Sequence, residues 1–255
     1  MHRVTTASTT AIACLMVSAP LLLAADPAPA NGVTWETSVG MGANLTAGNS
    51  KTVAANVHAT TERKGAPNEL RFLAEGNYGE AEALQADGSR KMEKNVQNDH
   101  FLGEYKYVPG GRNYGGMSLD IVQDDIADLD YRITFGPSLG RYLVKTDRTS
   151  LNAELGVVYI RDRVASVTDG RIAYRAFERW VFDVSKTAKF WECAQYLPTA
   201  DDFGRYLADA EIGAEAAMST RISLRVVAQD KYNSDPAAGK EKNDLLVTAG
   251  VAVKF

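Results

Sequence analysis

Apolar residues recur at every second position along most of this chain, and this spacing constrains its fold more than any other feature. The closing stretch LLVTAGVAVKF places Leu245, Val247, Val251, Val253 and Phe255 on one face of an extended segment. Such alternation is typical of a β-strand with one face in an apolar medium. No stretch after the amino-terminal segment spaces its apolar residues three and four apart as cleanly, so strands are predicted rather than helices.

Turn-forming residues divide this pattern into about twelve strands, each about long enough to cross a bilayer when tilted. The connections alternate between tight turns, such as PGGRN, and longer polar segments, such as EALQADGSRKMEK. An even number of antiparallel strands with this asymmetry is typical of a transmembrane β-barrel. The predicted strands are 33–46, 51–63, 68–80, 95–108, 113–124, 129–143, 150–162, 171–184, 187–197, 205–217, 219–231 and 243–255.

Aromatic side chains at the predicted strand ends indicate which apolar medium the strands face. Tyrosines gather at one end of the predicted barrel, and a tryptophan and the terminal phenylalanine lie at the other. Amphipathic rings collect at the two membrane–water interfaces, whereas a soluble β-sandwich has no reason to sort its tyrosines. The sequence therefore predicts an all-β, antiparallel transmembrane β-barrel in lipid. The predicted interface anchors are Trp35, Tyr78, Tyr131, Tyr159, Tyr206, Tyr232 and Phe255.

The first thirty residues predict export. A short basic start, the apolar run AIACLMVSAPLLLAA and the small-residue sequence APA have the order of a cleaved signal peptide. A membrane-spanning helix is the rival interpretation, but the run is short and contains Pro20. We therefore expect residues 1–30 to be a signal peptide and residues 31–255 to form one barrel domain. Loss of Cys14 would leave Cys193 alone, so no internal disulfide is expected.

The predicted export and the net charge indicate where the protein lies in the cell and which partners it binds. An exported barrel of this type is expected in the bacterial outer membrane, in contact with its lipid and with lipopolysaccharide. The formal net charge of -4 gives no support for a nucleic-acid partner, which would call for a basic stripe. The sequence leaves the oligomeric state open.

Charged residues of both signs recur on the face opposite the apolar one, which in a barrel is the lumen side. One interpretation is a polar, water-filled pore, and the other is an interior whose charges pair and brace the wall. The near balance of signs favours the braced interior, because selective pores tend to carry rings of one sign. The predicted lining residues are Glu36, Arg71, Glu75, Glu104, Lys106, Asp120, Arg132, Glu154, Arg175, Arg179, Asp183, Asp209, Glu211, Glu215, Arg221, Arg225 and Lys254.

A lipid-modifying hydrolase or acyltransferase is the alternative function, and it would need a nucleophile beside a base. His58 and His100 are both expected to face the lumen, with no recognisable Ser–His pair or nucleophile elbow nearby. Aspartates gather at 124–130 and 201–202, but their spacing does not fit a calcium-binding loop. An acidic rim, bridged by divalent ions to lipopolysaccharide phosphates, is expected instead. We predict no enzyme, no catalytic residue, no metal site and no cofactor.

Three residues break the pattern. Glu178 and Glu192 fall on the predicted lipid face, where carboxylates are costly. Either a bulge or a different register turns them inward, or they form a paired-carboxylate site or a protein-contact seam. Pro137 lacks the hydrogen-bond donor of a ladder and predicts a bulge in its strand.

The stretches WETSVGMGANLTAGNSKT, DYRITFGPSLGRYLVKTDRTSLNAELGVVY and YNSDPAAGKEKNDLLVTAGVAVKF resemble domain of unknown function 481, a family often labelled salt-induced outer membrane proteins. The final strand resembles the carboxy-terminal signal that the barrel-assembly machinery recognises. The resemblance implies fold and location and brings no established activity. The expected function is envelope integrity or passive small-solute passage, with a link to salt or osmotic stress implied by the family label alone. Adhesion through the outer loops is a third candidate.

Overall fold

The computed structural model describes residues 32–47 and 51–255, so the predicted signal peptide lies outside the described residues. Within these ranges, no helix is long and apolar enough to cross a membrane. Twelve strands make up the fold: β1 (Thr34–Thr46), β2 (Thr52–Lys64), β3 (Asn68–Leu84), β4 (Arg90–Tyr107), β5 (Asn113–Asp124), β6 (Leu129–Lys145), β7 (Thr149–Val164), β8 (Val167–Asp183), β9 (Ala188–Pro198), β10 (Tyr206–Ala217), β11 (Ile222–Asn233) and β12 (Asn243–Lys254).

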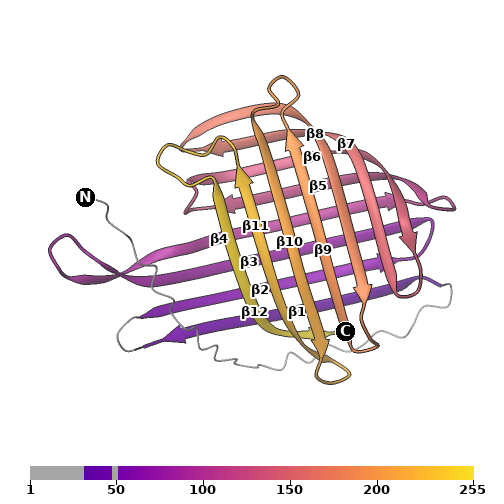
Figure 1. Ribbon diagram of the computed structural model, residues 1–255, viewed down its shortest axis with the longest axis horizontal. Helices are drawn as coiled ribbons and strands as arrows, with labels where there is room; N and C mark the ends of the chain where they lie inside the picture. Colours follow the sequence, from indigo (N-terminus) through magenta and orange to yellow (C-terminus); the bar gives the residue numbers. More distant parts are fainter. Residues whose placement is uncertain (1–31, 48–50) are drawn as a thin grey trace, which may run out of the picture.

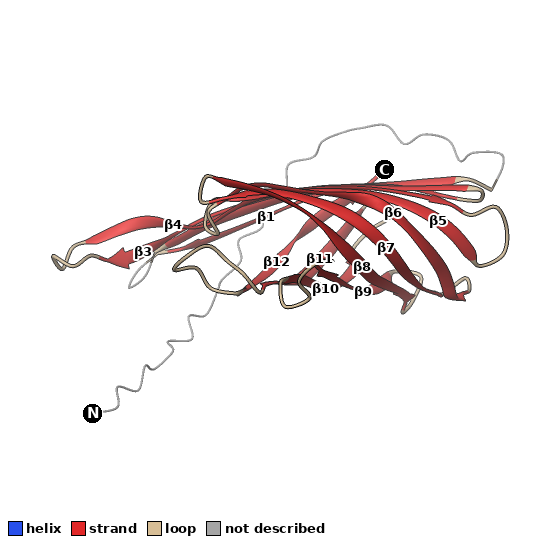
Figure 2. Ribbon diagram, turned by 90° about the horizontal axis from the view of Figure 1, so that it is seen from above, coloured by secondary structure: helices blue, strands red, loops and turns tan. Residues whose placement is uncertain are grey.

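The strands form one closed antiparallel barrel in which each strand pairs with its neighbours in sequence and β12 returns to β1. In Figure 1, β9–β12 cross steeply in front of a wall made by β1–β6. The view in Figure 2 shows that the barrel is flattened, so the two walls lie close together. The prediction of an all-β barrel of about twelve strands is confirmed.

Side chains on the two faces of the wall differ in the way the alternation predicts. Leu139 and Leu155 point outward and are 77% and 72% exposed, whereas Ile160 on the inner face is 0% exposed. Large apolar side chains are exposed along all of the strands' outer faces. An apolar surface of this extent is not stable in water and is the surface of a barrel that sits in lipid.

The hairpin of β3 and β4 is longer than predicted, because residues assigned to a polar loop continue both strands. Beyond the bulge between Gly79 and Glu80, the hairpin is polar on both faces and is held by charged pairs such as Arg90 Nη1 to Glu82 Oε2 at 3.1 Å. It projects past the other strands in Figure 1 and Figure 2. Ala81 and Ala83 alternate with glutamates, but Glu93 and Lys91 lie opposite them, so neither face of this part of the hairpin is apolar and the pattern did not predict it.

Pro137 does not produce the predicted bulge. The β6–β7 register is the same on both sides of it, from Phe135↔Tyr159 to Ser138↔Gly156. A Cβ on Gly156 would lie 2.5 Å from the Pro137 carbonyl oxygen, so the glycine lets β7 pass the proline closely without a change of register. The irregularities of β6 lie nearer its ends, at Leu129/Tyr131 and Tyr142/Val144.

Candidate functional site

Polar side chains meet across the inside of the barrel. Arg179 on β8 places Nη2 3.2 Å from Oε1 of Glu62 on β2, although these two strands are not neighbours in the ring. Gln229 on β11 donates to Glu75 on β3 at 3.0 Å, again between strands that do not pair. Such contacts can only pass through the lumen, so they connect opposite walls.

The largest set of these contacts is a chain of ion pairs, here called the central ion-pair network, in which positive and negative side chains alternate. Four strands, β2, β3, β4 and β8, supply most of its members, and β7 supplies one. Alternation of sign leaves each carboxylate between two cations, which is the arrangement that buried charges need. In order, the network runs Arg179–Glu62 (3.2 Å), Glu62–Arg71 (3.2 Å), Arg71–Glu104 (3.2 Å), Glu104–Arg175 (3.9 Å), Arg175–Glu154 (2.7 Å) and Glu154–Lys106 (3.0 Å).

Glu154 is the most heavily bonded carboxylate of the network. Its side chain is 3% exposed and faces Arg175, which is 4% exposed. Besides Arg175 and Lys106, the carboxylate accepts hydrogen bonds from the Tyr114 hydroxyl at 2.9 Å and the Ser138 hydroxyl at 3.0 Å. Four donors satisfy both oxygens, so this buried charge is stabilised locally.

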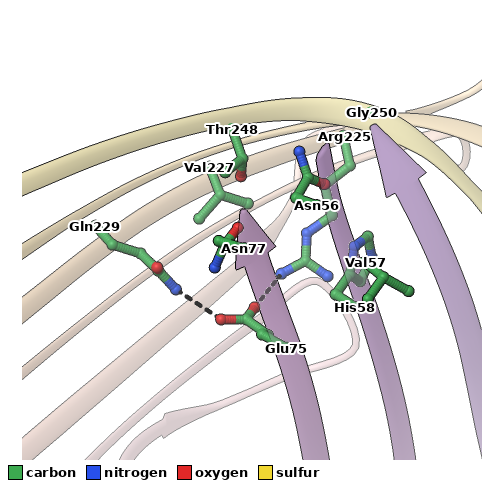
Figure 3. Close-up of a pocket in the computed structure, with 10 residues that line it drawn as sticks. All are labelled: Asn56, Val57, His58, Glu75, Asn77, Arg225, Val227, Gln229, Thr248 and Gly250. Atoms are coloured by element: carbon green, nitrogen blue, oxygen red, sulfur yellow. Dashed lines mark hydrogen bonds and ion pairs between the residues drawn. The ribbon is translucent and has the colours of Figure 1, made fainter. Parts of the chain in front are cut away.

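A second polar group surrounds Glu75 (Figure 3). One carboxylate oxygen accepts from Gln229, and the other lies 3.9 Å from the Arg225 guanidinium. Gln229 also donates to Glu211 at 2.8 Å, so this group links three strands. The cavity beside it has a volume of about 20 Å³, room for about one water molecule.

Apolar side chains fill the lumen on either side of these polar groups. Val158, Ile160, Ala173, Leu197 and Leu207 form one buried cluster near the long-loop end of β7–β10. A second cluster lies near the tight-turn end of β4–β6 and contains Val108, Tyr114 and Tyr142. The alternation of the sequence did not predict an apolar cluster inside the barrel. Side chains of both kinds therefore fill the interior, as they do in small barrels.

The other predicted lining residues lie nearer the two mouths. Arg132 Nε lies 3.2 Å from Asp162 Oδ2, toward the long-loop end. At the tight-turn end, Glu36 pairs with Lys64 at 2.7 Å in an exposed position. Glu215 is buried and binds Lys254 at 2.5 Å and Lys189 at 3.5 Å.

Trp191 occupies the lumen between two of the predicted charged residues. Its indole Nε1 donates to Glu211 Oε1 at 2.6 Å, and the Arg225 guanidinium lies 4.9 Å from the ring centroid. Arg221 is placed differently from the expectation, because β11 begins at Ile222 and Arg221 lies exposed in the preceding turn. The predicted strand 219–231 thus begins three residues too early.

Three important interior residues were missing from the predicted lining: Glu62, Asp162 and Trp191. The alternation could have identified the first two. Every second residue of β2 and β7 faces the lumen, and Glu62 and Asp162 occupy such positions. Trp191 also faces the lumen by this count, because its neighbour Glu192 was predicted to face lipid, but tryptophans are more typical of the membrane interface than of a polar lining.

Neither histidine is part of a catalytic arrangement within the described residues. His100 Nε2 lies 2.9 Å from Asp120 Oδ2, and His58 Nε2 is buried without a hydrogen-bond partner. No serine, threonine or cysteine of the described chain hydrogen-bonds to either ring, and no group of three potential ligands is placed to hold a metal ion. The lipid-modifying alternative gains no support from this arrangement.

The acidic loop residues make both ion pairs and local contacts. Asp125, Asp128 and Asp130 pair with Lys94, Lys240 and Arg163 at 3.0–3.2 Å. Asp124 accepts hydrogen bonds from the backbone amides of Ile126 and Ala127, and Asp202 accepts one from Gly204. These bonds to backbone amides stabilise the turns. Whether the acidic rim binds divalent ions stays a prediction.

Aromatic rings gather at both ends of the outer face. Tyr206 lies between Tyr196 and Tyr232, with ring centroids 5.3 Å and 5.5 Å away. At the opposite end Trp180 contacts Phe182 and Phe190, with centroids 6.0 Å and 5.6 Å away.

The predicted anchors are distributed in the same way. Trp35, Tyr78 and Tyr159 are exposed on the outer face, Tyr131 is half-buried near the long-loop end, and Phe255 donates its backbone amide to Thr37 at 2.9 Å. Their role as membrane anchors stays a prediction.

Glu178 and Glu192 do point outward, as the alternation indicated. The β8–β9 ladder runs from Ala176↔Tyr196 to Asp183↔Lys189 without a register shift, so the bulge that would turn them inward is absent from it. Glu178 pairs with Ala194 and Glu192 with Trp180, so the two carboxylates are diagonal neighbours on one face.

Together, the closed ladder, the apolar outer face and the filled interior define a β-barrel that spans a membrane with its strands. The chain belongs to the family described as protein of unknown function DUF481, whose model matches residues 39–255. The resemblance predicted from the sequence motifs is confirmed. No curated protein matches the chain.

Several solved barrels are similar in fold at low identity. An outer membrane channel from Pseudomonas putida F1 is 8% identical, covers 91% of this chain and 97% of its own, and has a TM-score of 0.48. The NanC porin is 7% identical, with 86% and 97% covered and a TM-score of 0.47. The translocator domain of the autotransporter NalP from Neisseria meningitidis is 11% identical, with 89% of each chain covered and a TM-score of 0.44. At these values the similarities indicate neither substrate nor selectivity.

Proposed function

We propose that this protein is an outer-membrane β-barrel that reinforces the bacterial envelope, with a lumen that the central ion-pair network holds closed to all but the smallest solutes. The contact between Arg179 and Glu62 carries this proposal, because it joins opposite walls across the lumen. A pore for metabolites needs open space at that level, and these two side chains occupy it.

The balance of charge supports a closed interior over a selective pore. Each carboxylate of the network lies between cations, so little unpaired charge is left to attract a permeating ion. The two apolar clusters add barriers without polar groups to replace an ion's hydration shell. Passage of small solutes would therefore require the network to open.

Location and assembly are part of the same proposal. An apolar belt bounded by aromatic rings at both ends fits a bilayer, and the strand that ends at Phe255 fits recognition by the barrel-assembly machinery. Export by a cleaved signal, contact with lipopolysaccharide and a response to salt or osmotic stress remain proposals.

Single-channel recording from the refolded full chain in a planar bilayer, at several salt concentrations, tests the function. A closed barrel gives silent traces with rare, brief openings, while heat-modifiable migration on a gel shows that the protein is folded. Steady openings whose conductance rises in proportion to salt would contradict the proposal and indicate a water-filled pore.

A further inference from the structure

The outer face of the barrel has a groove where small side chains interrupt the apolar surface. It crosses β5–β9, has a volume of about 840 Å³ and is called the outer groove below. One ladder row runs Arg141, Ala153, Glu178 and Ala194, and the next runs Leu139, Leu155, Ala176 and Tyr196, so three alanines form a floor between larger side chains. Its floor residues are Ala153, Ala176 and Ala194, and the outward side chains around them are Leu139, Arg141, Leu155, Glu178 and Tyr196.

Residues of opposite charge lie on the two sides of this floor. Arg141 pairs with Ala153, and Ala153 pairs with Glu178, so the two charged residues lie two strands apart in one row, roughly 10 Å. Glu192 lies diagonally next to Glu178, and the two carboxyl groups interact with each other.

The ordinary partners of such charges are missing from the described part of the chain. Neither Glu178 nor Glu192 forms an ion pair there, and the Arg141 guanidinium donates only to the neutral Asn113 Oδ1, at 3.4 Å. Charges on the lipid face are costly unless they are matched, so a ligand that supplies both a cation and an anion would relieve them together.

The level of these charges in the membrane indicates which kind of ligand can reach them. Glu192 lies opposite Trp180, whose ring contacts Phe182 and Phe190 at the tight-turn end of the barrel. Aromatic rings of this kind mark the membrane–water interface, the level at which lipid headgroups lie. A headgroup can thus reach the charges while its acyl chain stays in the bilayer.

We propose that the outer groove is a binding site for a zwitterionic glycerophospholipid whose headgroup carries a primary amine. The phosphate lies against Arg141, the ammonium donates hydrogen bonds to Glu178 and Glu192, and an acyl chain lies over the alanine floor beside Leu139 and Leu155. A primary ammonium has three donors, which matches two adjacent carboxylates. A second copy of this chain is the other candidate occupant, but a concave groove with a floor of alanines fits a flexible chain better than a barrel wall.

Native mass spectrometry of the refolded full chain tests this site with phosphatidylethanolamine and phosphatidylglycerol of identical acyl chains. We expect phosphatidylethanolamine to be retained at least about tenfold more strongly, since only that headgroup supplies a cation. The double variant Glu178→Gln/Glu192→Gln should lose this preference. Arg141→Gln should weaken both lipids, and Ala176→Phe, which fills the floor and leaves the charges, should do the same.

Glu241→Gln in the loop before β12 is the matched control, because it removes a carboxylate far along the chain from the groove strands. It should retain the preference for phosphatidylethanolamine, and heat-modifiable migration should show that every variant is folded. Equal retention of the two lipids by the natural chain would overturn the proposal. So would an unchanged preference in the Glu178→Gln/Glu192→Gln variant, or a dimer that binds no lipid and is lost with Arg141→Gln.

Discussion

Arg179 and Glu62 form an ion pair at 3.2 Å between β8 and β2, on opposite sides of the flattened barrel. Through Arg71, the same carboxylate continues into the rest of the central ion-pair network. The separation of the two walls is thus set by the lengths of these side chains, and the lumen can widen only if the pairs part.

Removal of Arg179 should open the lumen. With Arg179→Ala, Glu62 keeps Arg71 and Lys64 as partners, so we expect a modest loss of stability of about 1–3 kcal/mol. Single-channel recording should show openings that are longer and more frequent than those of the natural chain.

The exposed pair between Arg163 and Asp130, at 3.0 Å, provides the control for this measurement. Arg163→Ala should change stability by about 0–1 kcal/mol and leave conductance unchanged. A double-mutant cycle that combines Arg179→Ala with Glu62→Ala should give a coupling energy of about 0.5–3 kcal/mol. If Arg179→Ala stays as silent as the natural chain while remaining folded, the network does not close the lumen.

Glu154 should matter more for stability than any exposed carboxylate, because it accepts from Arg175, Lys106, Tyr114 and Ser138. Glu154→Ala removes the anion of Lys106 and leaves the buried Arg175 only the more distant Glu104, at 3.9 Å, so we expect the free energy of unfolding to fall by about 3–5 kcal/mol. Urea unfolding in lipid vesicles measures this change. Asp130→Asn, the control, should change it by about 0–1 kcal/mol, and equal effects of the two variants would disprove the central role of Glu154.

Gly213 allows Trp191 to lie flat against the inner wall. A Cβ at this position would lie 2.0 Å from Cζ2 of the indole, so Gly213→Ala forces the ring to move away from Glu211. We expect a loss of about 1–3 kcal/mol and a shift of tryptophan fluorescence. In Gly115→Ala, where nothing lies within 4 Å of the added methyl, neither quantity should change comparably. Unaltered fluorescence in folded Gly213→Ala would show that Trp191 is not held there.

The alternation of the sequence predicted most of the barrel because it records which side of the wall each residue faces. It placed Arg71, Glu154 and Arg179 on the lumen side, where the structure shows them paired across or around the interior. It could not show which of them meet, because strands far apart in sequence, such as β2 and β8, are brought together only by the flattened cross-section.

Exceptions to the pattern have local causes. Beyond Gly79 the hairpin carries charged residues on both faces, so its sequence resembles that of a polar loop. Ile160 and Trp191 face inward although they are apolar, because the flattened lumen is filled by packed side chains as well as by charges. Glu178 was predicted to face lipid against its chemistry, and it does. The outer groove beside it forms only when five strands pair in the correct register. The sequence of a single strand does not predict that register.

The seam that closes the barrel is its shortest ladder. β1 and β12 pair only from Ser38↔Lys254 to Met41↔Val251, whereas each of them pairs along nearly its full length with its other neighbour. Within the described residues, the β1–β12 ladder has no residue pair beyond Met41↔Val251 toward the long-loop end, although both strands continue past this pair. Local opening costs less free energy where fewer hydrogen bonds must break. We therefore expect peptides that cover 43–46 and 245–248 to exchange hydrogen faster than the β10–β11 ladder.

A cysteine pair tests the seam directly. Met41→Cys and Val251→Cys, in a Cys193→Ala background, place two thiols at directly paired positions, within the separation that a disulfide spans. Hydrogen exchange followed by mass spectrometry on the oxidised protein in lipid nanodiscs should then slow at 245–248 and stay unchanged in β10. Protection equal to that of β10 before oxidation would mean that the seam is as firmly closed as the other ladders.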